Sequence, residues 1–344
     1  MGLVISLPAI VENWRSLARL APQARPGAVV KADAYGLGAD RVAPALYAAG
    51  ARDFFVALAA EGRAIRPLLG DDARIFVLSG AMPGEDLGGL IPVLNSAAQF
   101  FRRRTLHPRA AFAIQLDSGM NRLGMEPGEW AAIRSEALAA PTDEGQGPVL
   151  VMSHLANADE PDHPGNQAQL DQFRAITRGV DAPLSLAATG GILLGRAYHF
   201  DLTRPGIGLY GGRPFLDAQP VVSLDLAVIQ TRIVQPGEGV GYGFAWTAGR
   251  PSRIATVSAG YADGILRSLS GRGLELWAGD RSCPVVGRVS MDLLTVDVTH
   301  LPDIPDSLSL LTERQGIDAV ADQAGTIGYE ILTSLGSRYP RRWL

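Results

Sequence analysis

The chain has 344 residues, of which 47% are hydrophobic, and a formal net charge of -4. This length suits two domains or one large barrel with an appendage, and the small negative charge gives no reason to expect a nucleic-acid partner. No stretch reaches the roughly eighteen apolar residues of a membrane span, and the N-terminus lacks the pattern of an export signal. Cys283 is the only cysteine, which excludes an internal disulfide and predicts a cytoplasmic protein.

Short β-rich runs alternate with helix-like stretches from residue 28 to about residue 210. Strands are expected at Ala28–Val30, Phe54–Leu58, Arg74–Leu78, Ile91–Leu94, Ala111–Leu116, Val149–Met152, Leu184–Ala187 and, weakly, just before Pro205. Helices are expected between them, for example at Ala39–Ala49, Ser96–Thr105, Glu129–Ala139 and Gln167–Thr177. Such alternation is typical of the α/β class, and we predict a (β/α)8 TIM-like barrel over residues 1–218.

The pattern changes after residue 218. Apolar and polar residues alternate along Pro220–Val234, and short runs punctuated by Gly and Pro follow it. These runs are Ile254–Val257, Leu274–Trp277, Val285–Val289 and Leu294–Val298, and they precede a helix-like tail at Ile317–Leu335. We therefore predict a mainly β C-terminal domain over residues 219–344.

Lysine is nearly absent from this chain. Of the 31 residues that are Lys or Arg, only Lys31 is a lysine. Compositional drift toward arginine explains this equally well if Lys31 is an ordinary surface cation. One function cannot pass to arginine, however: an amine that loses its proton can attack a carbonyl carbon and form a Schiff base. Lys31 is therefore a candidate nucleophile.

The unusual residues follow the expected strands at their carboxyl ends, where the functional face of such a barrel lies. They are Lys31, Arg122, His154, Thr189, Arg204, Gly206 and Ile207. The small residues after the last two strands suit a phosphate, which free backbone N–H groups bind. An amine and a phosphate nest on one face together suggest pyridoxal 5'-phosphate (PLP).

The same segments resemble the alanine racemase family. VVKADAYGLGA is similar to the family's cofactor-lysine signature, and LDSGMNRLG, SHLA, RPGIGLYG, GYADG, GRVSMDLLTVDVT, GTIGYE and RYPRRW match in order. The resemblance implies a PLP-dependent enzyme that interconverts L-alanine and D-alanine. It also implies a homodimer whose active sites are shared between subunits.

Carried over by position, the resemblance implies that Lys31 holds PLP and acts as one catalytic base, and that Tyr261 is the other. A hydrogen-bond chain would run from Tyr261 through His154 to Arg204, at the cofactor's pyridine nitrogen. The phosphate would contact Tyr35, Thr189, Gly206, Ile207 and Tyr329, and the substrate carboxylate would contact Arg122 and Met291. Tyr261 and Met291 would come from the partner subunit.

One position departs from the family pattern. Many members carry a carbamylated lysine where this chain has Gln115, and no second lysine exists to replace it. We hypothesise that the Gln115 amide holds Arg122 directly, with a bound anion such as chloride supplying the missing negative charge.

Other functions stay open on the residues alone. Tyr261 in its glycine-flanked turn is also typical of a core aromatic residue. A PLP-dependent decarboxylase, a racemase with another substrate and a non-enzymatic PLP carrier are the rivals. Arg204 disfavours a decarboxylase, and the β domain disfavours a non-enzymatic PLP carrier. The bulky Phe244 and Trp246 favour a small substrate. No histidines have metal-like spacing, so no metal is expected.

Overall fold

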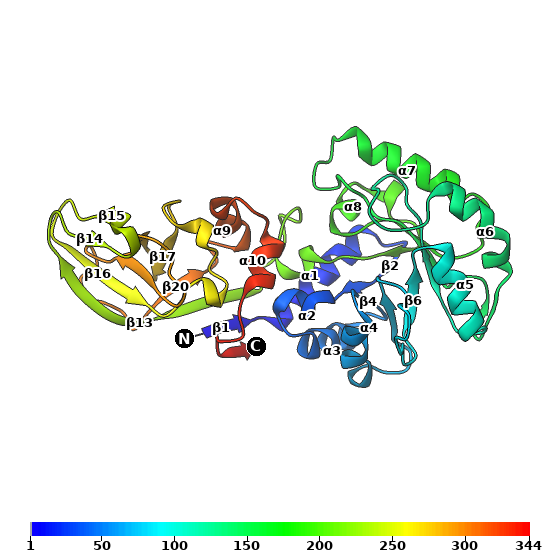
Figure 1. Cartoon of the computed structure of the whole chain (residues 1–344), viewed down its shortest axis with the longest axis horizontal. Helices are drawn as coiled ribbons and strands as arrows, with labels where there is room; N and C mark the ends of the chain where they lie inside the picture. Colours follow the sequence, from blue (N-terminus) through cyan, green and yellow to red (C-terminus); the bar gives the residue numbers. More distant parts are fainter. Residues whose placement is uncertain (1) are drawn as a thin grey trace. The chain divides into compact units, whose positions relative to one another are not determined.

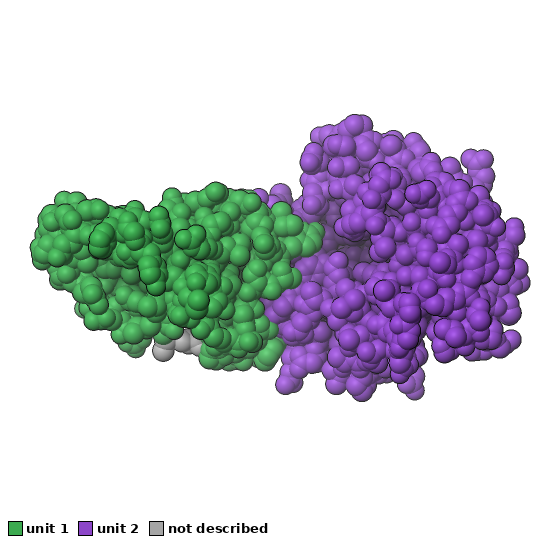
Figure 2. All heavy atoms as spheres, in the orientation of Figure 1, with its two compact units in different colours: residues 1–9, 219–344 green, residues 10–218 purple. Residues whose placement is uncertain are grey.

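The computed structural model describes residues 2–344. They divide into two compact units: residues 1–9 and 219–344 form unit 1, and residues 10–218 form unit 2 (Figure 2). Sequence analysis puts residues 1–9 in the barrel, and the strand pairing corrects this. Strand β1 (Gly2–Ile5) pairs antiparallel with β13 (Val222–Val234) and parallel with β21 (Arg341–Trp343), so the N-terminal strand belongs to the β domain.

Unit 2 is built on a curved parallel sheet of seven strands. In the order in which they pair, these are β11 (Leu184–Ser185), β10 (Leu150–Met152), β7 (Ala113–Gln115), β6 (Ile91–Leu94), β5 (Arg74–Val77), β4 (Asp53–Val56) and β3 (Ala28–Val29). Phe54, Phe55 and Val56 of β4 are all fully buried. Strands covered on both faces favour such continuous apolar runs over alternation.

The segment that contains β12 (Leu202–Thr203) lies between the two edges of this sheet. Strand β12 pairs with β2 (Arg25–Pro26). The Arg204 amide donates to Ala187 O at 2.8 Å, and the Val29 amide donates to Pro205 O at 3.0 Å. The weak strand expected before Pro205 thus connects the edge strands β11 and β3. The predicted fold class, a TIM-like barrel followed by a mainly β domain, is confirmed.

The helices of unit 2 lie around the strands (Figure 1). They are α2 (Lys31–Gly36), α3 (Ala39–Ala49), α4 (Ala59–Ile65), α5 (Ala97–Leu106), α6 (Pro127–Ala139), α7 (Pro164–Ile176) and α8 (Thr189–Leu193), with 3-10 turns at Arg66–Leu68, Arg196–Tyr198 and Ile207–Tyr210. Helix α1 (Leu7–Leu20) begins in unit 1 and continues into unit 2. A small hairpin is formed by β8 (Pro141–Thr142) and β9 (Gly145–Gln146).

Local sequence explains several helix starts. Ser96 caps α5 by accepting a hydrogen bond from the Gln99 amide. Helices α6 and α7 begin at Pro127 and Pro164, and proline is favoured at a first helical position because its φ is already helical. Trp130 of α6 is 2% exposed in a cluster with Phe100 and Phe112. Within residues 2–344, no helix is both long and apolar enough to cross a membrane.

Unit 1 contains an eight-stranded sheet. Its strands, in pairing order, are β16 (Ser252–Val257), β19 (Leu294–Asp297), β18 (Arg281–Val286), β17 (Glu275–Ala278), β20 (Ser307–Leu311), β13, β1 and β21. Strand β13 pairs with β20 along its first half and with β16 along its second half, past a register shift between Val228 and Gln230. This bulge lets one long strand close the antiparallel sheet on itself.

The remaining elements of unit 1 are short. A hairpin is formed by β14 (Gly239–Val240) and β15 (Trp246–Thr247). The 3-10 turns lie at Tyr242–Phe244, Tyr261–Asp263 and Arg267–Leu269. The expected helical tail is two helices, α9 (Ile317–Ala324) and α10 (Gly328–Ser334), because Gly325 ends α9 with a left-handed φ of 75°.

Candidate active site

Lys31 lies two residues beyond β3, at the start of a left-handed turn. Ala32, Asp33, Ala34 and Tyr35 have φ values of 52° to 56° and ψ values of 35° to 52°. This backbone costs an L-residue about 1–2 kcal/mol, and four such residues in succession persist only where the surroundings hold them. The turn is tied down by the Ala34 amide, which donates to Val30 O at 2.9 Å, and by the Asp33 carboxylate, which accepts from the Ala39 amide at 2.7 Å. Strained backbone of this kind is concentrated at functional sites in proteins.

The amine of Lys31 is half-buried among positive charges. Burial lowers its pKa most, and Arg122 and Arg204 lower it further, while Glu61 opposes them. A lower pKa increases the fraction of neutral amine at physiological pH. The neutral amine is the form that attacks a carbonyl carbon.

Arg204 is buried, with 3% of its surface exposed. Its guanidinium donates to the Ser185 hydroxyl, to Ser153 O at 2.6 Å and to Leu186 O at 3.4 Å. No carboxylate pairs with it among residues 2–344, although buried charges are normally paired. Burial lowers the pKa of Arg204 to about 9. The site therefore contains a positively charged guanidinium whose hydrogen-bond acceptors are all neutral.

His154 follows β10 on the same face as Lys31. Burial, followed by the charges of Arg204, Arg122 and Lys31, lowers the pKa of His154 to about 3. The imidazole is therefore neutral at physiological pH. Within the described residues, no hydrogen bond joins the His154 ring to Arg204. In this structure the two side chains of the expected relay are therefore not joined by a direct hydrogen bond, and Arg204 acts on His154 through its charge.

Four of the residues expected around the phosphate lie in unit 2: Tyr35, Thr189, Gly206 and Ile207. The Thr189 hydroxyl accepts from the amides of Gly206, at 3.0 Å, and Gly208, at 3.2 Å. A Cβ added to Gly206 would lie 2.5 Å from the Tyr35 hydroxyl oxygen. The Tyr35 ring packs on Tyr210 with a centroid distance of 4.6 Å. Ile207 follows Gly206 and starts a 3-10 turn.

Arg122 lies in the exposed loop after β7, and Gln115 is buried within β7. The loop is shaped by Asp117, whose Oδ1 accepts from the amides of Gly119 and Met120 at 2.7 and 2.9 Å. No hydrogen bond joins the Gln115 amide to Arg122 in the described chain. The direct contact that we hypothesised is therefore absent from this structure, and a bound chloride stays a prediction.

Unit 1 carries the other expected groups. The Tyr261 amide donates to Ser290 O and the Ala262 amide donates to Met291 O, both at 2.9 Å, so Tyr261 and Met291 are neighbours. Their side chains are 43% and 53% exposed. Tyr329 lies on α10 and is half-buried.

A salt-bridge cluster holds the segment around Tyr261. Buried Asp263 accepts from Arg338 Nε at 2.6 Å and from Nη2 at 2.7 Å, and its Oδ2 also accepts from the Gly260 amide. Arg338 donates in addition to Asp292 at 2.8 Å. One arginine thus links the turn that carries Tyr261 to the loop that carries Met291.

Comparisons with known proteins agree with this geometry. The family model described as "Alanine racemase, N-terminal domain" matches residues 5–214, and "Alanine racemase, C-terminal domain" matches residues 221–343. An alanine racemase of Dinoroseobacter shibae is 58% identical over 346 residues, covering 99% of this chain and 97% of that protein. The chain belongs to the alanine racemase family.

Solved structures of alanine racemases share the whole fold. The enzyme from Bartonella henselae, described with covalently bound pyridoxal phosphate, is 36% identical, with a TM-score of 0.93 and 99% of each chain covered. The biosynthetic alanine racemase of Pseudomonas aeruginosa is 38% identical, with a TM-score of 0.90 and coverage of 100% of this chain and 99% of that one.

Sequence reasoning missed the residues that support this alanine racemase site. The Ser118 hydroxyl lies 2.7 Å from the Ser153 hydroxyl, and Gln169 donates to His154 O at 3.0 Å. Glu61, Ser185 and Arg338 were also missed. Ser118, Ser153 and Arg338 lie within the quoted segments LDSGMNRLG, SHLA and RYPRRW. Glu61 has a local signal, since a glutamate three residues after a helix N-cap often binds the backbone there.

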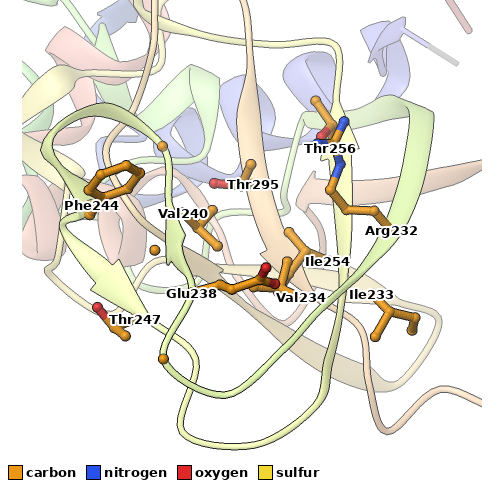
Figure 3. Close-up of a pocket in the computed structure, with 13 residues that line it drawn as sticks. Arg232, Ile233, Val234, Glu238, Val240, Phe244, Thr247, Ile254, Thr256 and Thr295 are labelled. Carbon is orange, nitrogen blue, oxygen red and sulfur yellow. The ribbon is translucent and has the colours of Figure 1, made fainter.

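A pocket in unit 1 is separate from these residues. It lies between the β14–β15 hairpin and strands β13 and β16, with a volume of about 830 Å³ (Figure 3). Arg232 and Glu238 are its charged lining residues, and Glu238 already accepts from the Gln235 amide at 2.6 Å. None of the predicted site residues lines this pocket, so it is not the candidate active site.

Gly206→Ala should weaken PLP binding in a folded protein. The new Cβ would collide with the Tyr35 hydroxyl, and overpacking of this kind costs about 1–3 kcal/mol. We expect the dissociation constant for PLP, measured by absorbance titration, to rise by about tenfold to a hundredfold. Gly249→Ala, where a Cβ meets only open space, is the matched control. Equal affinities for the two variants would show that Gly206 does not need to be a glycine.

His154 should make the folded state acid-sensitive. Its folded pKa of about 3 lies below the ordinary histidine pKa of 6.5, so between these two values the unfolded chain binds the extra proton. The free energy of unfolding should therefore fall as the pH is lowered through 6.5. His154→Gln should make this slope shallower, as measured by urea denaturation at several pH values. An unchanged slope would contradict the buried, neutral state of this ring.

Proposed function

We propose that Lys31 and Tyr261 are the two acid–base groups of this PLP-dependent alanine racemase, acting on opposite faces of the substrate. The overall activity, interconversion of L-alanine and D-alanine, follows from the chain's family membership over nearly its full length. The observation that carries the assignment of residues is the single lysine, held on a strained turn with a lowered pKa next to a buried guanidinium.

The residues of unit 2 fit PLP. Lys31 would hold the cofactor's aldehyde carbon covalently. The Thr189 hydroxyl, which already accepts from the Gly206 amide, would form with the Ile207 amide and the Tyr35 hydroxyl a neutral donor group that suits a phosphate, and Gly206 would let the phosphate approach closely. Arg204 would donate to the pyridine nitrogen, since it is buried without a carboxylate partner. Tyr329, from unit 1, would add a further phosphate contact. When bound, PLP supplies an electron sink that weakens the Cα–H bond of the attached amino acid.

Racemisation needs a proton removed from one face of Cα and another delivered to the opposite face. Lys31 can do this on one side because burial and two arginines favour its neutral amine. Tyr261 would serve the other side. A neutral phenol is a poor base, so Tyr261 would need cationic neighbours, and in the shared site Arg122, Arg204 and Lys31 would supply positive charge. Arg122 and the Met291 backbone would bind the substrate carboxylate.

Arg204 also separates this function from its closest rival. A decarboxylase of the same cofactor class benefits from a protonated pyridine, which a carboxylate at the nitrogen stabilises. A guanidinium donates a hydrogen bond without giving up its proton. The electron sink is then weaker, which favours returning a proton to Cα over side reactions.

We propose a homodimer in which unit 1 completes the partner's site. Tyr261 and Met291 are large side chains that a monomer leaves exposed, and Tyr242 and Phe244 are each 71% exposed on the same unit. Exposed aromatic and apolar side chains in such numbers favour a protein interface.

The bulk of Tyr242 and Phe244 also supports a small substrate such as alanine. The lone Cys283, buried and unpaired, supports a cytoplasmic location.

Hydrogen exchange at Cα tests the two-base assignment. With L-alanine in deuterated water, the wild type should lose optical rotation while deuterium enters Cα. Tyr261→Phe should keep exchange for one enantiomer only and lose racemisation by about 10²–10⁴-fold. Lys31→Arg should fold but hold no cofactor covalently. Release of carbon dioxide would identify a decarboxylase, and exchange of both enantiomers by Tyr261→Phe would remove Tyr261 from its role.

Mixing two inactive variants tests the shared site. If Lys31 and Tyr261 of one site come from different subunits, a dimer of one Lys31→Arg chain and one Tyr261→Phe chain has one intact site. Equal amounts, unfolded and refolded together, should recover about a quarter of wild-type activity, because half of the dimers are mixed. Each variant refolded alone is the control. No recovery, with mixed dimers verified by mass spectrometry, would place both bases on one chain.

A further inference from the structure

The carboxylate of Glu61 binds two different segments of the barrel. Glu61 lies in the first turn of α4, and its Oε2 accepts from the amides of Ala57, at 2.7 Å, and Leu58, at 3.2 Å. Its Oε1 accepts from the Ala32 amide at 2.7 Å. The first two bonds are an ordinary helix start. The third bond reaches 29 residues back along the chain and has no role in α4.

The Ala32 amide is the peptide group that directly follows Lys31. Ala32 is also the first of the four left-handed residues. A hydrogen bond from its amide therefore fixes the start of the strained turn. The other ties of the turn, from Asp33 to Ala39 and from Ala34 to Val30, lie within its own segment. Glu61 instead fixes the turn to the carboxyl end of β4. A hydrogen bond to an ionised acceptor is stronger than a neutral one.

Glu61 also supplies negative charge beside Lys31. The charged groups that act on this amine are Arg122 and Arg204, which disfavour its protonated form, and Glu61, which favours it. One carboxylate thus accepts a hydrogen bond from the backbone next to Lys31 and partly offsets the effect of the two arginines on its amine.

We propose that Glu61 is a positioning residue for Lys31: it holds the strained turn through the Ala32 amide and so aims the amine at the site where the cofactor is attached. This inference rests on the proposed role of Lys31 as the cofactor-binding residue. Glu61 does not touch the reacting atoms. It acts through the backbone and through its charge.

Two substitutions separate these contributions. Glu61→Gln removes the charge and leaves one acceptor oxygen, which cannot serve both α4 and Ala32. Glu61→Asp keeps the charge but is one methylene too short to span both segments. Glu129→Gln is the matched control, because Glu129 likewise accepts a neighbouring backbone amide, that of Ala97 at 2.7 Å, at a helix start away from Lys31.

Two measurements on the full-length chain test the proposal. The first is kcat and KM for alanine in the holoenzyme. We expect Glu61→Gln to lower kcat/KM by about tenfold to a hundredfold, mostly through kcat, since small displacements of a reacting group have effects of this size. The second is the titration of Lys31 in the cofactor-free chain, followed by NMR with lysine labelled at Cε. Because the chain has one lysine, this label gives one side-chain signal. Its pKa should fall in Glu61→Gln, because a nearby negative charge is lost, and stay near the wild-type value in Glu61→Asp and Glu129→Gln.

Opposite results would overturn the proposal. Wild-type kcat/KM and lysine titration in Glu61→Gln would show that the contact is incidental. Equal loss in Glu61→Gln and Glu129→Gln, with an unchanged lysine pKa, would show a general structural role. Should Glu61→Gln not fold, Glu61→Asp decides: kcat/KM reduced with the lysine pKa retained supports positioning, and wild-type kcat/KM rejects it. Cofactor still covalently held by Lys31→Arg would instead overturn the proposed function itself.

Discussion

The buried guanidinium of Arg204 is the interaction on which the rest of the site depends. Its donors are used by a hydroxyl and two backbone carbonyls and by no carboxylate, so its charge is felt by its neighbours. That charge contributes to the lowered pKa values of both Lys31 and His154. Burial is the larger cause for both residues, and the charge of the unpaired guanidinium adds to it, so the lysine is more readily neutral and the histidine stays neutral. In our proposal for this member of the alanine racemase family, the guanidinium would also temper the electron sink that the cofactor provides.

Backbone strain is the second constraint. Four consecutive left-handed residues follow Lys31, and a Cβ added at position 206 would lie 2.5 Å from the Tyr35 hydroxyl oxygen. Both features lie at the carboxyl ends of barrel strands, where rigid neighbours hold conformations that a free chain would avoid. Glu61 is one such neighbour, because its carboxylate connects the strained turn to the next βα unit along the chain. The barrel thus stabilises a local geometry that the local sequence disfavours.

The proposed catalytic groups are divided between two units that use different kinds of support. In unit 2, neutral hydrogen bonds and buried charge position Lys31, His154 and Arg204. In unit 1, the salt bridges of Arg338 to Asp263 and Asp292 join the turn of Tyr261 to the loop of Met291. The exposure of Tyr261 and Met291, 43% and 53%, explains why a partner chain is needed in our proposal.

The sequence alone determined the class of fold and the identity of the candidate residues. Alternating strands and helices predict a parallel barrel, and a parallel barrel brings the carboxyl ends of its strands together, so the order of the chain is enough to place Lys31, His154 and Arg204 on one face. Tertiary structure decided what depends on contacts distant in sequence: the pairing of β1 with β13, the left-handed turn, the third hydrogen bond of Glu61, and the absence of a bond between Gln115 and Arg122. Periodicity reports which residues are buried, but strain and long-range hydrogen bonds arise only when separate segments are packed against one another.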